Sequence, residues 1–317
     1  MSGFAYRIDH ARVEGVPIDE ALDRPVELAW VHLRAHDEGA RAWLSERAGL
    51  PAYVVDALTA TETRPRCDQH EGGALVNLRG RAVEDMPSAD PLASVRIWAA
   101  RGRVFSVARA RLCALATVEE CVKRGRIHDP GDLIAEFASA ITADLDPHVA
   151  ELGDQLDGCE ASLYSGGIFE LRRLVNQVRS EAIGYRRFLN PQRAALEKLA
   201  TLPGDWIADD DRLHLAAAAD RAARMAEELE AIRERSALVH DALTDMRAEQ
   251  LDQRGLVISV AALIFLPLTF ITGLYGMNVK ELPGADDPWA FDVITIGCIV
   301  LALVIAAFFF TRRWISR

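Results

Sequence analysis

Three aspartates recur at helical spacing in the C-terminal third of the chain, at Asp241, Asp245 and Asp252. Steps of three and four residues place side chains on one face of an α-helix. In a ring of identical subunits these carboxylates would stack as inner cation rings or gate elements, because carboxylate rings concentrate cations and bind hydrated divalent ions. The same spacing is also typical of a solvated helix face, and the aspartates alone leave both interpretations open.

The same face continues through small, hydroxylated or apolar residues, which we call the 255–273 stripe. It consists of Gly255, Ile258, Ala262, Leu266, Thr269 and Gly273. Such side chains suit a narrow and partly dewetting pore. One helix cannot enclose a pathway, so this interpretation requires an oligomer that contributes one such helix per subunit.

The stripe leads to Gly276, Met277 and Asn278. A ring of neutral Asn278 amide oxygens can hydrogen-bond a first-shell water of a cation, or replace it, without trapping the ion. Gly276 would permit the backbone bend that ends the helix and turns Asn278 toward the axis. A plain helix-ending turn is the alternative interpretation of these residues.

Two apolar runs position these residues. Residues 256–274 and 293–311 each form an uncharged run of 19 residues. At about 1.5 Å per residue, each run spans roughly 28 Å, close to the ~30 Å hydrocarbon core of a bilayer. We therefore predict a hairpin of two transmembrane helices, at residues 255–279 and 289–311.

Five arginines flank the hairpin on one side, at Arg247, Arg254, Arg312, Arg313 and Arg317, whereas the loop between the spans carries only Lys280 as a basic residue. The positive-inside rule then predicts cytoplasmic termini, a basic cytosolic tail at 312–317 and an outer loop at 280–288. That loop carries three acids, Glu281, Asp286 and Asp287. They can attract cations to an outer mouth, although a solvated loop would carry the same residues.

The residues before the hairpin predict a cytosolic domain of mixed α/β/α class at 1–205 and a long stalk helix at 206–254. Apolar segments predict strands at 26–33, 74–78, 94–99 and 104–108, and Pro191 suggests a break between two helices. Along the stalk, apolar residues form a seam typical of coiled coils. The seam residues are Met225, Leu229, Ile232, Val239, Leu243 and Met246, with Ser236 in register. A rod of this length must lean on other copies or on the rest of the chain.

Composition narrows the function classes. The 317 residues are 50% apolar and 26% charged with a net charge of −11, which excludes general affinity for nucleic-acid backbones. Cys67 and His70 have C-x-x-H spacing without a second half, which we interpret as a polar loop at a strand end rather than a zinc site. Neither a nucleotide-binding nor a hydrolase motif is present, so we expect no enzyme activity, no cofactor and no use of ATP.

Gly276, Met277 and Asn278 directly follow an apolar run, and in this position the sequence resembles the CorA-type metal ion transporters. Further stretches are similar to the ZntB zinc-transporter branch of that family. They are Glu-Thr-Arg-Pro-Arg at 62–66, Pro-Gln-Arg at 191–193, Leu-Pro-Gly at 282–284 and Arg-Arg-Trp at 312–314.

The resemblance implies a homo-pentamer in the bacterial inner membrane that transports divalent cations, with zinc favoured and with coupling to protons as a property of the branch. Met277 departs from the branch, which more often has Ile or Val there, and so do Lys280 and Glu281, which replace two glycines. A magnesium or cobalt channel of the CorA type is therefore the alternative. A membrane-anchored scaffold or sensor without transport is an alternative of a different class.

Overall fold

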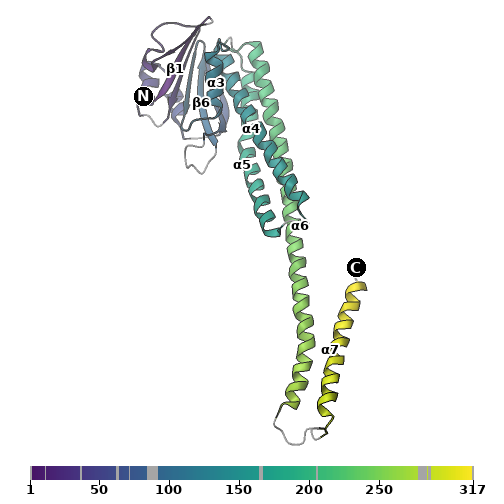
Figure 1. The fold of residues 1–317 in the computed structure, drawn as a ribbon. Coiled ribbons are helices and arrows are strands. Elements are labelled where there is room, and N and C mark those ends of the chain that lie inside the picture. Colours follow the sequence, from purple (N-terminus) through teal and green to yellow (C-terminus); the bar gives the residue numbers. More distant parts are fainter. Residues whose placement is uncertain are drawn as a thin grey trace. The chain divides into compact units, whose positions relative to one another are not determined.

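The computed structural model describes residues 2–10, 12–35, 38–61, 64–70, 72–83, 92–163, 167–204, 206–277, 284 and 287–315 (Figure 1). The chain divides into two compact units, Met1–His240 and Asp241–Arg317. The long helix α6 (Asp209–Tyr275) contributes its first part to the N-terminal unit and its second part to the C-terminal unit.

Seven strands form one mixed sheet in the N-terminal unit, in the order β2-β1-β3-β7-β6-β5-β4. Neighbouring strands are antiparallel except β3 and β7, which are parallel at the centre of the sheet. The central strands are rich in the β-branched and aromatic residues that fit a pleated, buried surface. The strands are β1 (Gly3–Asp9), β2 (Arg12–Val16), β3 (Leu28–Arg34), β4 (Arg66–His70), β5 (Gly73–Arg81), β6 (Leu92–Ala100) and β7 (Arg103–Ala108).

Helices cover both faces of this sheet (Figure 1). On one face, Phe105 and Trp98 belong to a core completed by Trp43 and Leu58. On the other face, the ring of Trp30 packs edge-on against Phe137 of α4 at a centroid distance of 5.7 Å. The predicted α/β/α class is therefore confirmed. The first cover comprises η1 (Ile18–Glu20), α1 (Glu38–Ala42), η2 (Trp43–Arg47) and α2 (Ala52–Thr59), and the second α3 (Ala114–Lys123), α4 (Pro130–Ala161) and α5 (Ile168–Ala200).

Within the N-terminal unit, α6 packs against α4 and α5. The Arg221 guanidinium donates to Thr142 Oγ1 of α4 at 3.1 Å, and Arg186 of α5 pairs with Glu230 at 2.9 Å. The predicted seam is buried between these helices, so in this part the rod leans on the rest of its own chain, one of the two supports expected. The buried seam residues of this unit are Met225, Leu229, Ile232, Ser236 and Val239.

The predicted break at Pro191 is wrong, because α5 runs unbroken through it. The side chain of the next residue, Gln192, is buried and accepts a hydrogen bond from the backbone N–H of Arg79 on β5 at 2.7 Å. Leu189 and Leu196 are fully buried on either side. This packing against the sheet holds the helix together across a residue that lacks the N–H donor.

Three strands were missed by the sequence pattern: β1, β2 and β4. Cys67 and His70, expected in a loop, lie in β4, an edge strand that pairs with β5. Cys67 is 3% exposed, and burial raises the pKa of its thiol to about 11. In the folded protein this thiol is therefore protonated at neutral pH.

The C-terminal unit holds two helices apolar and long enough to cross a membrane, the end of α6 and α7 (Ala290–Ile315). In both, the most apolar window contains no buried residue. The first predicted span, 255–279, is the last part of α6 and ends four residues early, at Tyr275. The second, 289–311, lies almost entirely in α7 and the helix continues to Ile315.

Candidate functional site

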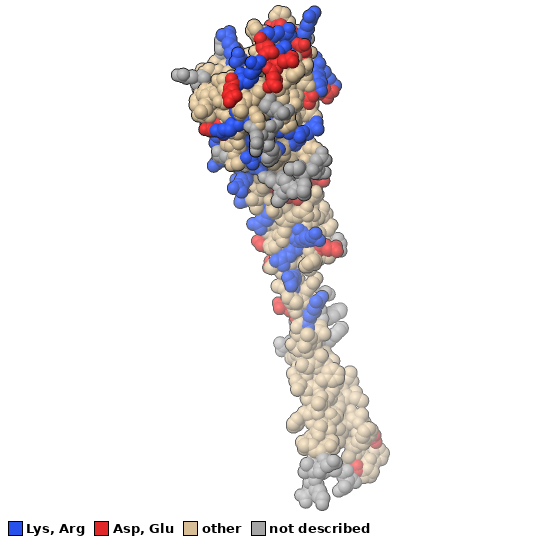
Figure 2. Space-filling model, turned by 90° about the vertical axis from the view of Figure 1, so that its left-hand side faces the viewer, with Lys and Arg blue, Asp and Glu red and all other residues tan. Residues whose placement is uncertain are grey.

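The 255–273 stripe lies on the apolar end of α6, and all six of its residues are exposed in the single chain. Ile258 and Leu266 are each 70% exposed. No Lys, Arg, Asp or Glu interrupts α6 between Arg254 and Tyr275, and Figure 2 shows this part of the surface free of charged side chains. The stripe is therefore an open apolar face rather than part of a core.

The opposite face of α6 is partly covered, at Val260, Ala261, Ile264, Pro267, Leu268 and Ile271. At about 100° per residue, the mean direction of this set lies roughly 160° around the helix from the stripe. The other helix of the unit, α7, runs beside α6 (Figure 1). It presents a complementary partly covered set at helical spacing, Ala290, Ile294, Cys298, Leu301, Ala302, Ile305 and Phe309. We conclude that α7 covers one side of α6 and leaves the stripe free.

The C-terminal end of α6 closes tightly around Gly276. Its N–H donates to the Thr272 carbonyl at 2.9 Å, and Met277 N–H donates to the Leu274 carbonyl at 3.5 Å. Gly276 does not adopt the left-handed backbone that favours glycine, but α6 ends directly before it, at Tyr275. A Cβ there would lie 3.0 Å from the Thr272 carbonyl oxygen, so any larger residue would require a small shift of this turn. Asn278 lies outside the described residues.

Two hydroxyl groups in the apolar part of α6 are satisfied within the helix. Ser259 Oγ donates to the Gly255 carbonyl at 2.9 Å, and Thr272 Oγ1 donates to the Leu268 carbonyl at 3.0 Å. Such back-bonding removes the cost of an unpaired hydroxyl in an apolar environment. These two hydroxyls therefore agree with placement in lipid.

The three aspartates predicted to form cation rings, Asp241, Asp245 and Asp252, are exposed on α6. Among the described residues, Asp241, Asp245 and Asp252 form no ion pair and do not gather into a set of metal ligands within one chain. They lie one and two helical turns apart along the rod, which is the arrangement that stacked rings in an oligomer would need. A single chain supplies one carboxylate per level.

Of the three outer acids, only Asp287 belongs to the described residues. Its carboxylate accepts a hydrogen bond from the Trp289 backbone N–H at 3.0 Å, at the start of α7. An acidic side chain satisfies the free N–H groups of a helix start, so Asp287 has a structural role that the sequence argument missed. Glu281 and Asp286 lie outside the described residues.

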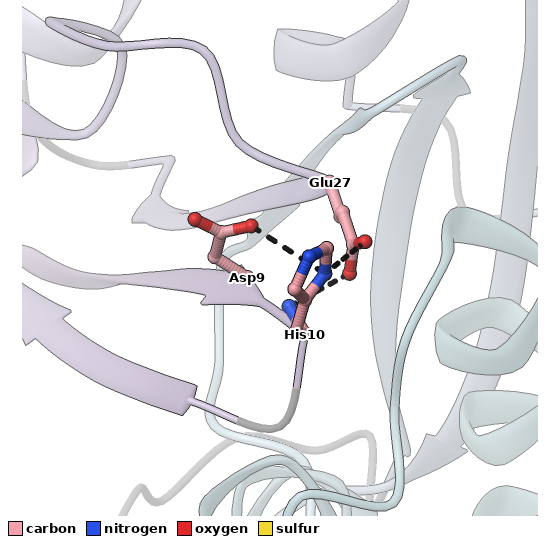
Figure 3. Close-up of side chains that lie close together, drawn as sticks. All are labelled: Asp9, His10 and Glu27. Atoms are coloured by element: carbon pink, nitrogen blue, oxygen red, sulfur yellow. Dashed lines mark hydrogen bonds and ion pairs between the residues drawn. The ribbon is translucent and has the colours of Figure 1, made fainter.

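The structure also brings together Asp9, His10 and Glu27, at the turn after β1 and just before β3 (Figure 3). His10 Nδ1 lies 2.5 Å from Glu27 Oε1 and 3.9 Å from Asp9 Oδ1. The His10 backbone N–H also donates to Glu27 at 2.8 Å and lowers the pKa of that carboxyl. Glu27 is 17 residues from His10, so spacing could not have revealed this group. The His10 ring occupies Glu27 Oε1, so a cation would have to displace the ring in order to bind that oxygen.

Comparison with known proteins decides the family. A family model described as CorA-like Mg2+ transporter protein matches residues 26–313. This chain is a member of the CorA-like family.

Two relatives cover nearly the whole CorA-like chain. The zinc transport protein ZntB of Cronobacter sakazakii is 29% identical over 311 residues, which are 97% of this chain and 92% of that protein. The solved full-length CmaX protein is 29% identical with a TM-score of 0.81, over 98% of each chain. The CorA magnesium transporter of Methanocaldococcus jannaschii, at 17% identity, shares the fold with a TM-score of 0.82 over 98% of this chain and 97% of that one. The fold of these solved structures, with an N-terminal α/β domain, a long helix and two apolar C-terminal helices, is thus the fold of this protein.

Proposed function

We propose that this CorA-like protein is a divalent metal cation transporter of the bacterial inner membrane, with zinc as its principal substrate. Copies of the chain surround a central pore lined by the 255–273 stripe, with Asn278 at its outer entrance. By likeness to the family, five copies assemble. Both termini face the cytoplasm, following the arginines at the inner ends of the two spans.

The observation that carries this proposal is the open face of α6. An apolar helix needs cover on every side, and α7 covers only one. Lipid can cover Leu or Phe side chains, but the stripe is enriched in Gly, Ala and Thr, which let helices approach one another closely. The stripe also leads directly to the Gly276, Met277 and Asn278 signature.

Zinc is favoured because curated relatives that align with this chain over most of their length are named zinc transport protein ZntB. A carboxamide ring at Asn278 fits any hydrated divalent ion, so the ring by itself does not select zinc over magnesium. At about 2.3 kcal/mol per charge per 100 mV, an inside-negative potential gives a divalent cation roughly 4.6 kcal/mol of inward drive. Uptake therefore needs no ATP.

Metal flux into liposomes holding the full-length protein tests the proposal. We expect Asn278→Ala to lose most of the zinc flux while the oligomer keeps its mass by light scattering. The matched control is Asn176→Ala, an exposed asparagine on α5, which should transport normally. Unchanged flux in Asn278→Ala, or a monomeric wild-type protein, would contradict a shared pore and favour a scaffold or sensor.

The same liposomes separate the finer assignments. Zinc flux that exceeds magnesium and cobalt flux at equal concentration supports zinc as the substrate, and the reverse order supports the magnesium or cobalt channel. An imposed inward proton gradient should accelerate zinc entry if protons are coupled to it. Equal rates with and without the gradient would exclude coupling.

A further inference from the structure

A buried carboxyl group lies at the start of α6, far in sequence from its neighbours. Asp211 is 2% exposed. One of its oxygens, Oδ2, accepts a hydrogen bond from the Ala208 backbone N–H at 2.8 Å. The same oxygen approaches Gly131 of α4 so closely that a Cβ on Gly131 would lie 2.1 Å from it. The carboxyl group is thus inserted against the first turn of α4, where only glycine leaves room.

The first turn of α4 carries two further carboxylates. Asp129 caps the helix by accepting from the Asp132 backbone N–H at 2.9 Å, and Asp132 accepts from the His128 backbone N–H at 2.9 Å. One carboxylate oxygen from each of Asp129, Asp132 and Asp211 lies within 4.8 Å of the other two. Because Asp211 is buried and like charges this close disfavour ionisation, the cluster favours a proton on one of the three carboxyl groups.

Little positive charge faces this group. Among the described residues, no Lys or Arg forms an ion pair with any of the three carboxylates, and the exposed His128 ring is 3.3 Å from Asp132. On α6 itself, Asp209 and Asp210 are exposed, and Arg212 turns away to the carbonyls of the preceding loop. The N–H groups at the start of α4 favour negative charge, but three clustered carboxylates exceed what one helix end stabilises.

We propose that Asp211 and Asp132 share one proton, and that this carboxylic acid–carboxylate hydrogen bond is a pH-sensitive joint between the start of α6 and the start of α4. When the joint is protonated, the Asp211 hydroxyl donates to Asp132 and holds the two first turns together. When the proton leaves to solvent, three carboxylates repel one another and both turns open. The joint lies at the base of the helix that carries the 255–273 stripe, but its chemistry does not depend on metal transport.

The direction of the pH effect follows from burial, which raises the pKa of Asp211 from 3.8 to about 7. A carboxyl group with a raised pKa in the folded state stabilises that state below the unfolded pKa. This stabilisation is lost as the pH rises through the folded pKa. The joint is therefore closed in mild acid and opens above neutral pH.

Hydrogen–deuterium exchange of the full-length protein in detergent, with a chelator present, tests the joint. After correction for intrinsic exchange rates, we expect protection of the first turns of α4 and α6 to fall severalfold between pH 6 and pH 8.5. Asp211→Asn keeps the acceptor for Ala208 N–H and supplies a permanent donor to Asp132, so its protection should stay high and independent of pH. Asp210→Asn, one residue away and exposed, should behave as the wild type.

Three results would overturn the proposal. They are wild-type protection that is flat with pH, an Asp211→Asn variant that follows the wild type, and an Asp210→Asn variant that loses the pH dependence equally. If chelation abolishes protection at every pH and added Mg2+ or Zn2+ restores it, the three carboxylates form a cation site instead. Should Asp211→Asn fail to fold, infrared spectra of the wild type decide, because the carbonyl band of a protonated carboxyl group must disappear above neutral pH.

Discussion

The two parts of α6 carry the same spacing of apolar residues in opposite environments. In the N-terminal unit, Leu229 and Ser236 of the seam are fully buried against α4 and α5. In the C-terminal unit, Ile258 and Leu266 of the stripe are each 70% exposed. One continuous helix is therefore buried by its own chain along the seam and left largely exposed by that chain along the stripe.

This difference indicates where the partners of each part are. A helix that is apolar all round and still exposed must be covered by something other than its own chain. The seam belongs to the folding core of one subunit, so changes there should act on stability. The stripe has no folding role within one chain, so changes there should act on transport with little effect on the subunit's stability.

The seam gives the largest expected effect. Leu229→Ala removes a fully buried side chain and should destabilise the N-terminal unit by about 2–5 kcal/mol. The matched variant Leu238→Ala lies on the same helix, but its leucine is 70% exposed, so its cost should be below about 0.5 kcal/mol. Thermal unfolding followed by tryptophan fluorescence measures both.

A large loss of stability in Leu238→Ala would contradict the difference between the two parts of α6. It would mean that other copies also cover the N-terminal part of α6, so that this part resembles the stripe. The protein concentration dependence of the unfolding midpoint then reveals the contact, because only an intermolecular interface makes that midpoint depend on concentration.

Acid should destabilise the N-terminal unit but not the apolar helices, and the loss of stability should be smaller than that caused by Leu229→Ala. His32 on β3 is 5% exposed, with Nδ1 2.8 Å from Ser106 Oγ, and burial lowers its pKa from 6.5 to about 4. Between about pH 6.5 and pH 4, His32 is therefore protonated in the unfolded chain but neutral in the folded chain. The free energy of unfolding should fall over this range by roughly 3 kcal/mol at most. The apolar parts of α6 and α7 contain no histidine and should keep their helicity over this range.

His32→Asn keeps a polar partner for Ser106 but cannot titrate in this range. The variant should therefore lose part of the acid slope of the unfolding midpoint between pH 7 and pH 4.5. His214→Asn replaces an exposed histidine on α6 and serves as the control, with the slope of the wild type. Identical slopes in all three proteins would show that another group governs acid unfolding.

An element could be predicted from the sequence where the spacing or composition within a single segment is enough to define it. The apolar runs, the seam and the unbroken rod all follow from spacing along α6, and strands β3, β5, β6 and β7 follow from their apolar composition. Strands β1, β2 and β4 escaped because charged and polar residues such as Arg7, Glu14 and Asp68 interrupt their pattern. Their place is fixed by pairing with neighbouring strands, which spacing does not encode.

Contacts between distant residues could not be predicted for the same reason. The joint of Asp132 and Asp211 links positions 79 residues apart, which spacing along one helix cannot reveal. Pro191 was read as a break because the packing of its neighbours on the sheet is a tertiary effect. At the stripe the limit is different, since the structure of one chain shows only an open face.

The smallest effect expected on stability, and the sharpest test of the comparison, is within the apolar part of α6. Leu266→Ala shortens an exposed stripe residue and should change metal flux severalfold, because it widens a hydrophobic constriction, while leaving the unfolding midpoint nearly unchanged. Ile264→Ala lies two residues away on the partly covered side toward α7, and should lower the midpoint while keeping the flux. Liposome flux and thermal unfolding of both variants make a two-by-two test. If Ile264→Ala alters flux and Leu266→Ala does not, the face toward α7 lines the pathway, and the open stripe faces lipid.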